Sequence, residues 1–258
     1  MDMLNSHCGI DRDISGVVRL TICNAGPLNI LGTPVISAVR EGLEQLARDR
    51  SIRVLVLAGQ SEKSLIGGAD IKEMATLNQV SAEAFITRLA GLCEAVRGFP
   101  APVIARMPGW CLGGGLEVAA ACDFRIAAHD AKFGMPEVRV GIPSVIHAAL
   151  LPRLIGWGRA RWLLMTAETI DAPTALAWGL VDAVAPEGGL DAAVDHLAGT
   201  LLASGPEALR AQKDLLRQWE ELPLKESVDL SIKAFGRSFL TDGPTRLMQE
   251  FIERKRKR

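Results

Sequence analysis

The chain of 258 residues carries a formal net charge of -1, with 48% hydrophobic and 23% charged side chains. These values fit one large globular core and exclude both a disordered chain and a chain whose overall charge would attract nucleic acid. No apolar run is long enough to cross a membrane, and the first residues lack the basic start and apolar stretch of a secretory signal.

The five cysteines lie scattered through apolar stretches, without CxxC pairing and without His-rich metal spacing. Such a pattern predicts reduced, buried thiols and no metal site. We therefore expect a soluble, cytoplasmic protein.

Predicted strands alternate with predicted helices through the first two thirds of the chain. Thr33 and Pro34 suggest an N-cap and a first helical position, and apolar residues recur after them every three or four positions. A polar loop with glycines is expected over residues 60–70, and helical spacing resumes from about Ser81. The predicted strands are residues 17–23, 52–57, 102–105 and 124–128. This alternation predicts right-handed βαβ crossovers and an α/β fold.

Strand signals stop after about residue 189. Residues 190–202, 206–219 and 227–258 look helical, with breaks at Gly205-Pro206 and at Asp242-Gly243-Pro244. We divide the chain into a core, residues 1–188, and an all-α segment, residues 189–258, that serves as a lid or oligomerisation element. Helices of this size do not bury their own apolar faces, so we expect them to dock on the core or on a neighbouring subunit.

The first of three candidate site segments runs from Gly67 to Ile71. Its two glycines allow the backbone to turn tightly and to approach a ligand closely. Asp70 is suited to cap the element that follows, which would leave free backbone amides aimed outward. The alternative is a solvent-exposed turn.

The second segment runs from Gly109 to Glu117, and its three consecutive glycines, Gly113 to Gly115, open a helix. Unpaired N–H groups at such a helix start offer a place for an oxyanion. The segment lacks the GK[ST] ending of a phosphate-binding loop. Close helix-to-strand packing through glycine is the alternative. Glu117 lies among apolar residues, and a carboxylate buried there needs hydrogen-bond or charged partners, or a raised pKa.

The third segment, residues 133–137, ends in Pro136 and Glu137. The proline biases Met135 towards an extended conformation, so Glu137 is expected to start a new element at the end of a loop. The alternative is an ordinary surface carboxylate.

Together these segments resemble the crotonase (enoyl-CoA hydratase/isomerase) superfamily over nearly the whole chain. GGADIKEM at residues 67–74, GxxLGGGLExAxxCD at 109–123 and FGMPEV at 133–138 occur in the family's order and approximate spacing. Further matches lie at residues 24–29, 151–156, 177–182 and 251–255.

The resemblance implies a crotonase-like spiral of ββα units with an all-α C-terminal segment, assembled as a homotrimer or homohexamer. By motif position it places an oxyanion hole at the N–H groups of Ala69 and Gly114, and catalytic carboxylates at Glu117 and Glu137. The expected ligand is an acyl-CoA thioester. Its other candidate binding residues are Leu28, Gly67, Gly68, Asp70, Ile71, Gly113, Pro136 and Ser144.

The implied activity is hydration of the 2,3 double bond of a 2-enoyl-CoA. By the family analogy, Glu117 helps to activate the water and Glu137 supplies the α-proton. No metal or redox cofactor is implied, because CoA arrives as part of the substrate. The alternatives are another acyl-CoA reaction (isomerisation, decarboxylation or thioester hydrolysis) and a non-catalytic member that binds RNA.

Two regions leave functional alternatives open. Ser144 replaces the first glycine of a glycine-rich family stretch, and bulkier residues follow it, so the acyl preference or the reaction can differ. Ser144 either contacts Glu137 or substrate, or caps the next helix. His147 is either a catalytic addition or a core or interface residue. The basic run from Arg254 to Arg258 has three interpretations. By the family resemblance, Arg254 or Lys255 lies near the CoA phosphates. Otherwise the run binds nucleic acid, although no aromatic platform accompanies it, or it forms a solvated tail.

Overall fold

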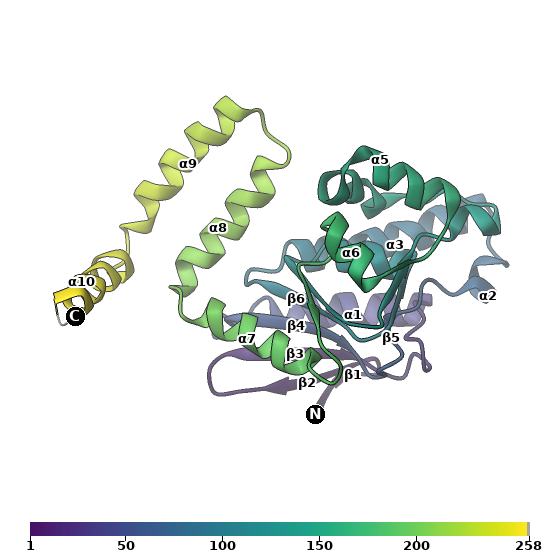
Figure 1. Cartoon of the computed structure of the whole chain (residues 1–258), viewed down its shortest axis with the longest axis horizontal. Helices are drawn as coiled ribbons and strands as arrows, with labels where there is room; N and C mark the ends of the chain where they lie inside the picture. Colours follow the sequence, from purple (N-terminus) through teal and green to yellow (C-terminus); the bar gives the residue numbers. More distant parts are fainter. Residues whose placement is uncertain (257–258) are drawn as a thin grey trace.

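A computed structural model describes residues 1–256 and shows two β-sheets with helices packed around them (Figure 1). The larger sheet has the strand order β1-β2-β3-β4-β6-β8-β11. Its first three strands pair antiparallel, and the strands from β3 to β11 run parallel. Its strands are β1 (Asp2–Asn5), β2 (Cys8–Arg12), β3 (Val17–Ile22), β4 (Val54–Gly59), β6 (Val103–Met107), β8 (Phe124–Ala128) and β11 (Ala183–Ala185).

The smaller sheet has the order β10-β9-β7-β5, with β10 antiparallel and the others parallel. Its strands are β5 (Ser64–Ile66), β7 (Trp110–Leu112), β9 (Lys132–Gly134) and β10 (Ile170–Asp171). The chain passes from the larger sheet to the smaller one in each turn, as β4 to β5, β6 to β7 and β8 to β9, before a helix follows. This arrangement confirms the predicted spiral of ββα units.

The helices lie between and around these strands. They are α1 (Thr33–Leu46), α2 (Ile71–Met74), α3 (Gln79–Arg97), α4 (Gly114–Ala120), α5 (Leu151–Thr166), α6 (Ala172–Trp178) and α7 (Leu190–Leu202), with 3₁₀ turns η1 (Glu137–Val140) and η2 (Ile146–Leu150) between β9 and α5. No described helix is long and apolar enough to cross a bilayer.

The four strands predicted from the sequence all belong to the larger sheet. The segment predicted as a polar loop, residues 60–70, instead contains β5, whose three residues are buried. The strands of the smaller sheet are two or three residues long. Segments this short show no period-2 alternation, so their sequences resemble those of loops.

Two predicted helix starts need correction. Thr33 is the first residue of α1 rather than its N-cap, which is Gly32 without a side-chain cap. The Thr33 N–H instead donates to Glu73 Oε2 at 2.8 Å, and its hydroxyl donates to the other oxygen of that carboxylate. Helix α3 begins at Gln79, two residues before the predicted start, because the Asn78 side chain caps it.

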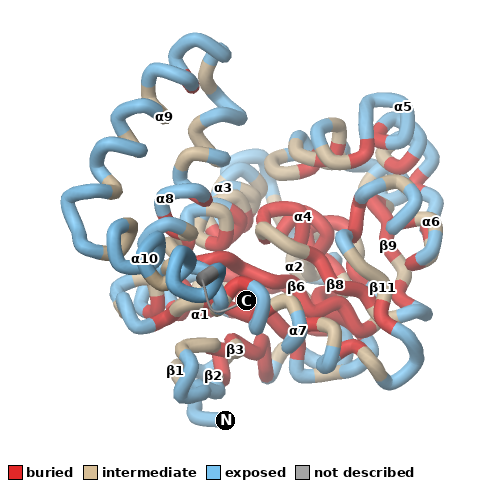
Figure 2. The backbone as a smooth tube through the Cα atoms, turned by 60° about the vertical axis from the view of Figure 1, so that its left-hand side comes forward, coloured by how far each residue is buried: buried red, intermediate tan, exposed pale blue. Residues whose placement is uncertain are grey.

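Buried residues form two hydrophobic clusters on the two faces of the larger sheet. Figure 2 shows buried backbone along the central strands and α4. The main cluster joins that sheet to α1, α3, α4 and the smaller sheet. The second lies beneath α7, where Leu190, Val194 and Ala198 cover Val54, Val56 and Ile104. Helix α7 therefore packs on the sheet, whereas the division at residue 189 stays a prediction.

Three further helices extend away from this body: α8 (Pro206–Trp219), α9 (Leu224–Ser238) and α10 (Gly243–Arg256) (Figure 1). The helices predicted for the C-terminal segment are confirmed, and residues 257–258 lie outside the described part. Helix α8 is tied to the core, because Lys213 Nζ donates to Asp123 Oδ2 at 2.6 Å and Arg210 donates to the Ile52 carbonyl at 2.8 Å. Helices α9 and α10 leave many large apolar side chains exposed.

Helix α4 lies against β5 with no space for a side chain at the contact. A Cβ atom on Gly115 would lie 2.4 Å from the Ile66 carbonyl oxygen and 2.7 Å from the Ile66 Cβ. All seven residues of α4 are buried, so the helix has no room to shift. The glycine at this position sets the distance between the start of α4 and the end of β5.

We predict that Gly115→Ala lowers the free energy of unfolding by about 1–3 kcal/mol, because the added methyl overpacks the contact with Ile66. Gly158→Ala in α5 is the matched control, since a Cβ there meets nothing within 4 Å. Alanine at Gly158 should stabilise the chain by up to about 1 kcal/mol. Urea unfolding of both variants measures the difference, and equal stabilities would contradict the packing argument.

Candidate active site

The turn into α4 leaves a backbone amide unused. Gly113, at φ 52° and ψ -127°, adopts a conformation that side chains disfavour. Its carbonyl accepts the N–H groups of Leu116 at 2.8 Å and Glu117 at 3.1 Å, and its own N–H donates to Gly134 O at 2.9 Å. Within residues 1–256 the Gly114 N–H has no hydrogen-bond acceptor. This amide is available to a ligand.

A second amide is left unused at Ala69. An isolated parallel bridge pairs Ala69 with Leu31, through Leu31 N to Gly68 O at 2.9 Å and Asp70 N to Leu31 O at 3.0 Å. These bonds flank Ala69, so its own N–H points away from Leu31. It finds no acceptor in the described part of the chain.

The two segments that carry these amides lie next to each other. A Cβ atom on Gly68 would lie 3.5 Å from the carbonyl oxygen of Leu112, the residue that precedes Gly113. Gly68 also has φ 123°, which a side chain rarely adopts. The glycines thus allow two chain segments with unpaired N–H groups to lie next to each other, as an oxyanion hole requires.

Glu117 lies one turn into α4 and is only 3% exposed. Its Oε1 accepts the Ala148 N–H at 3.0 Å. The pKa of Glu117 is raised to about 8, mainly by burial; the Ala148 hydrogen bond lowers it, and the nearby Glu137 adds a smaller increase. The carboxyl group therefore holds a proton near neutral pH, as expected for a carboxylate in apolar company.

Glu137 is the first residue of η1, so the prediction that it starts a new element is confirmed. Its side chain turns towards the α4 turn, where a Cβ atom on Gly113 would lie 2.5 Å from Glu137 Oε1 and 3.9 Å from Pro136 Cδ. The Ser144 hydroxyl donates to Glu137 Oε2 at 2.8 Å. Of the roles left open for Ser144, contact with Glu137 is the one found, since η2 has Val145 as its N-cap.

Both glutamates are held in the same manner. The segment 144–148 binds one oxygen of each, through the Ser144 hydroxyl and the Ala148 N–H. The other oxygens face the glycine turn, since Glu117 Oε2 would lie 3.9 Å from a Cβ on Gly114 and Glu137 Oε1 lies close to Gly113. Two carboxyl groups thus have free oxygens beside an unpaired amide, an arrangement suited to moving protons next to a developing oxyanion.

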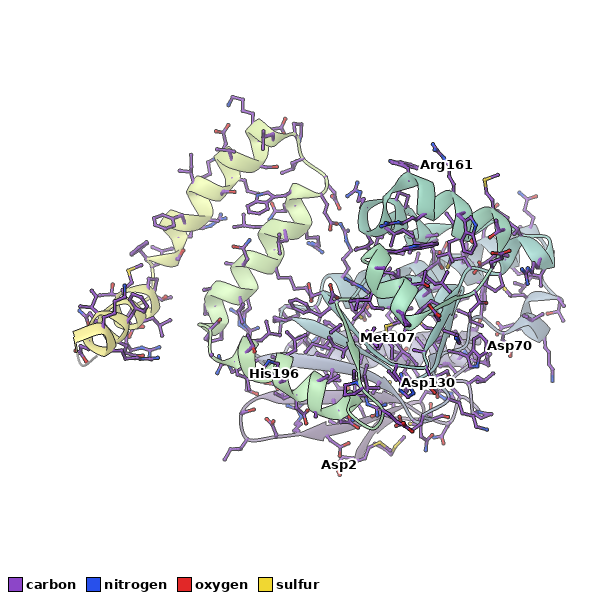
Figure 3. The ribbon with its side chains drawn as sticks, viewed as in Figure 1. Asp2, Asp70, Met107, Asp130, Arg161 and His196 are labelled. Carbon is purple, nitrogen blue, oxygen red and sulfur yellow. The ribbon has the colours of Figure 1, made fainter. Side chains whose placement is uncertain are left out.

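The remaining predicted binding residues have different surroundings. Leu28 packs on the Gly67 backbone and accepts its N–H at 2.7 Å. Asp70 caps α2, as predicted, by accepting the Lys72 N–H at 2.9 Å, and it lies at the edge of the body in Figure 3. Ile71 is 60% exposed on α2. Asp70 thus fixes the start of α2, whereas Leu28, which is 36% exposed, and Gly67 pack against each other.

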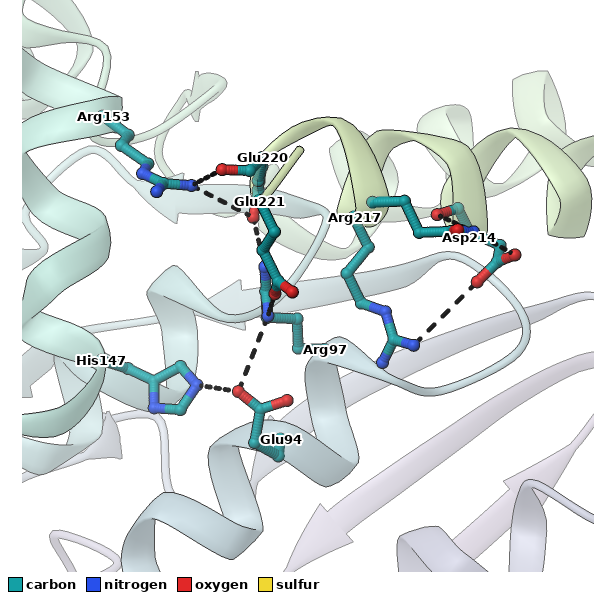
Figure 4. A network of polar contacts seen from close by, with 9 residues as sticks. Glu94, Arg97, His147, Arg153, Asp214, Arg217, Glu220 and Glu221 are labelled. Atoms are coloured by element: carbon teal, nitrogen blue, oxygen red, sulfur yellow. Dashed lines mark hydrogen bonds and ion pairs between the residues drawn. The ribbon is translucent and has the colours of Figure 1, made fainter. Parts of the chain in front are cut away.

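The His147 ring contacts neither Glu117 nor Glu137. Its Nε2 lies 2.8 Å from Glu94 Oε1 on α3, and a chain of ion pairs continues from Glu94 through Arg97 to Glu220 (Figure 4). The ring is part of a polar network between η2, α3 and the end of α8. This placement matches the core or interface role rather than a catalytic addition.

Two contributors to the site were missed by sequence reasoning. Ala148 acts through its backbone N–H, which no residue type reveals. Leu89 of α3 lies over the other side of the turn, where its Cδ2 would be 2.7 Å from a Cβ on Gly114. Leu89 lies on the buried face of α3, but nothing in the residues around it indicates that this face meets the turn.

The basic residues near the C-terminus lie on α10. Arg254 pairs with Glu250 at 3.4 Å, and Lys255 Nζ lies 5.0 Å from the centre of the Phe251 ring. The Arg256 side chain, Lys257 and Arg258 fall outside the described part. The proposed contact of Arg254 or Lys255 with CoA phosphates stays a prediction.

A cleft of about 570 Å³ opens elsewhere, between α8 and the core. Its lining includes Ala120 and Ala121 at the C-terminal end of α4, along with Lys213, and none of the predicted site residues. The unpaired amide and the two glutamates belong to the opposite, N-terminal end of that helix. We therefore assign the chemistry to the glycine turn and not to this cleft.

Comparison with known proteins identifies the family of this chain. A family profile described as Enoyl-CoA hydratase/isomerase matches residues 12–258. The chain belongs to this family. It is 34% identical over 230 residues to a crotonyl-CoA hydratase of Syntrophomonas wolfei, covering 89% of this chain and 88% of that protein. It is 32% identical over 241 residues to a short-chain-enoyl-CoA hydratase of Clostridium acetobutylicum, covering 93% and 92%.

Solved structures show the same fold. An enoyl-CoA hydratase from Bacillus anthracis superposes with a TM-score of 0.91 at 31% identity, covering 96% of both chains. DspI of Pseudomonas aeruginosa gives a TM-score of 0.92 at 30% identity, covering 97% of this chain and 95% of its own. The crotonase-like α/β fold expected from the sequence is confirmed.

The raised pKa of Glu117 predicts a pH-dependent stability. Its folded value of about 8 lies above the ordinary 4.5, so its contribution is fully present below about pH 4.5 and is lost as pH rises through about 8. Glu117→Gln removes the titrating group while keeping an acceptor for Ala148. We expect the stability of the variant relative to the unsubstituted chain to grow by up to a few kcal/mol between pH 5 and pH 9.

Urea unfolding across this pH range measures that difference. Glu83→Gln on the exposed face of α3 is the control and should track the unsubstituted chain at every pH. A stability difference for Glu117→Gln that does not change with pH would contradict the assigned proton.

Proposed function

We propose that this protein is an enoyl-CoA hydratase that adds water across the 2,3 double bond of a 2-enoyl-CoA to give a 3-hydroxyacyl-CoA. The observation that carries the proposal is the pair of glutamates, each with a free oxygen facing the Gly113–Gly114 turn. Relatives named as crotonyl-CoA and short-chain-enoyl-CoA hydratases support the same substrate class.

The thioester oxygen of the substrate accepts the N–H groups of Ala69 and Gly114. As water adds at the β-carbon, negative charge develops on this oxygen in an enolate-like state, and two fixed donors stabilise it more than they stabilise the ground state. Losing one such donor typically costs ~3 kcal/mol of transition-state stabilisation. Because the donors are backbone groups, their positions depend on the glycines around them and not on any side chain.

The glutamates move the protons. A water lies between Glu117 and Glu137, its oxygen bonds to the β-carbon, one of its protons passes to Glu117, and Glu137 delivers a proton to the α-carbon. Burial leaves a proton on Glu117 in the ligand-free protein. Hydration starts from the state in which Glu117 is a carboxylate that accepts the water proton and Glu137 is the acid that donates to the α-carbon.

This route uses carboxyl groups and backbone amides of the chain itself. We propose that the protein uses no cofactor or metal beyond the CoA that the substrate carries. The ligand is an acyl-CoA thioester, with Leu28, Gly67, Gly68 and Pro136 along its path.

A second candidate is another acyl-CoA reaction of the same family, such as isomerisation. The observation that favours it is the segment 144–148, where Ile146 and His147 stand at positions that are glycines in the family stretch. Larger side chains there change the space around the acyl group. Product analysis separates the two, because hydration removes the conjugated enoyl absorbance with net gain of water and isomerisation gains none.

We also propose a cytoplasmic homotrimer or homohexamer. Ile232 and Phe235 of α9 are each 67% exposed and line a groove of about 930 Å³ between α8 and α9. Apolar side chains on helices that extend from the body favour burial against another subunit. Five free, buried cysteines fit a reducing compartment.

The function is tested by incubating the purified protein with crotonyl-CoA and with a longer 2-enoyl-CoA, and following loss of the conjugated absorbance. We expect rapid loss, and we expect Glu117→Gln and Glu137→Gln each to lower kcat by about 10²–10⁴-fold because a proton-transfer group is removed. Glu83→Gln should keep full activity. Binding of acyl-CoA without any loss of absorbance would exclude hydration.

Association is tested by sedimentation and light scattering. We expect a mass of three or six chains, and replacement of Ile232 and Phe235 by serine should weaken association because it removes the exposed apolar side chains. Lys233→Ser on the same helix is the control. A monomer at micromolar concentration would contradict the proposed assembly.

A further inference from the structure

The Ser144 hydroxyl makes a single hydrogen bond in the described part of the chain, and that bond goes to Glu137. The distance from Oγ to Oε2 is 2.8 Å, within the normal range for a hydroxyl and a carboxyl oxygen. A hydroxyl has one proton to donate, so this proton is committed to the glutamate. Ser144 is partly buried, which limits competition from water.

The turn that precedes Ser144, residues 137–142, closes without its hydroxyl. Backbone bonds already do this, from Ile142 N to Glu137 O at 3.2 Å and from Gly141 N to Val138 O at 3.3 Å. Nor does Ser144 cap η2, whose N-cap is Val145. Neither the turn at residues 137–142 nor the start of η2 therefore depends on the Ser144–Glu137 bond.

The segment around Ser144 is held in a strained but fixed conformation. Ile146 has φ 41°, a value that a β-branched residue rarely adopts because it strains the backbone. The conformation is held by the residues that follow Ile146, through His147 to Glu94 and Ala148 to Glu117. Ser144 is thus presented to Glu137 by a segment with little freedom to move.

We propose that Ser144 is a positioning residue for the proposed hydration, holding Glu137 Oε2 so that Oε1 stays over the Gly113–Gly114 turn and delivers the α-proton from there. This inference rests on the proposed function. When Glu137 gives up its proton, the hydroxyl donates to the carboxylate that forms, and a hydrogen bond to a charged oxygen is stronger than one to a neutral acid. The contact therefore stabilises the transition state more than the ground state.

The test is Ser144→Ala, assayed for crotonyl-CoA hydration. We expect kcat to fall about 10- to 100-fold, as for loss of a hydrogen bond to a charged group, while KM changes by less than about 2-fold. Ser144→Thr keeps the hydroxyl and should restore most of kcat. Ser51→Ala is the matched control, because the Ser51 hydroxyl donates to the Asp49 carboxylate at 2.6 Å on the exposed surface.

A readout besides activity comes from titrating Glu137 in the ligand-free protein by carbon NMR of labelled carboxyl groups, with the signal assigned through Glu137→Gln. Loss of a donor to the carboxylate should move the Glu137 midpoint to higher pH in Ser144→Ala, and threonine should move it back. If the alanine variant does not fold, Ser144→Gly removes the same hydroxyl and gives the same comparison.

The outcomes separate the positioning role from the function itself. Unchanged kcat and an unchanged midpoint in Ser144→Ala would overturn the positioning role while leaving hydration intact. An equal loss of kcat in the alanine and threonine variants would also overturn it. If the unsubstituted protein hydrates no enoyl-CoA, the proposed function is wrong. In that case an unchanged Glu137 midpoint in Ser144→Ala would also show that Ser144 does not act on Glu137.

Discussion

The close approach of Gly115 to the Ile66 backbone is the contact on which the site depends. It lets the buried helix α4 start directly beside the end of β5, where any side chain at Gly115 would collide with Ile66. From that start, Gly113 turns the chain so that the Gly114 N–H is left unpaired, while Gly68 brings Ala69 past Leu112. Two amides from different turns of the spiral are thereby left without acceptors on neighbouring segments, because the fold, and not the side chains, places them.

Burying a carboxyl group destabilises the folded chain, and the packing of the core offsets this. Glu117 sits inside α4 among apolar residues, so its charged form is disfavoured and its pKa rises to about 8. Raising it makes proton transfer possible near neutral pH. Its partner Glu137 begins a 3₁₀ turn at the end of a loop and is held by a side-chain hydroxyl. The segment 144–148 connects the two glutamates, so a change there affects both proton positions at once.

The sequence predicts the parts of this arrangement that depend on side-chain type and spacing better than those that depend on backbone atoms. The buried strands of the larger sheet, the Asp70 cap and the start of an element at Glu137 follow from residue type and spacing, and each is found. The strands of the smaller sheet escape prediction because two or three residues carry no periodicity. The role of Ala148 is not predictable because every residue except proline has a backbone N–H group. The expected cap at Thr33 is wrong, since a distant carboxylate, Glu73, serves the start of α1.

The most direct measurement is a crystal structure of the protein with a bound acyl-CoA such as acetoacetyl-CoA, which offers a thioester oxygen without being consumed. The geometry predicts that oxygen at about 2.7–3.1 Å from the N atoms of both Ala69 and Gly114, with Glu117 and Glu137 on either side of the acyl carbons. A thioester oxygen bound away from these two amides, with the glutamates out of reach of the acyl chain, would contradict the account.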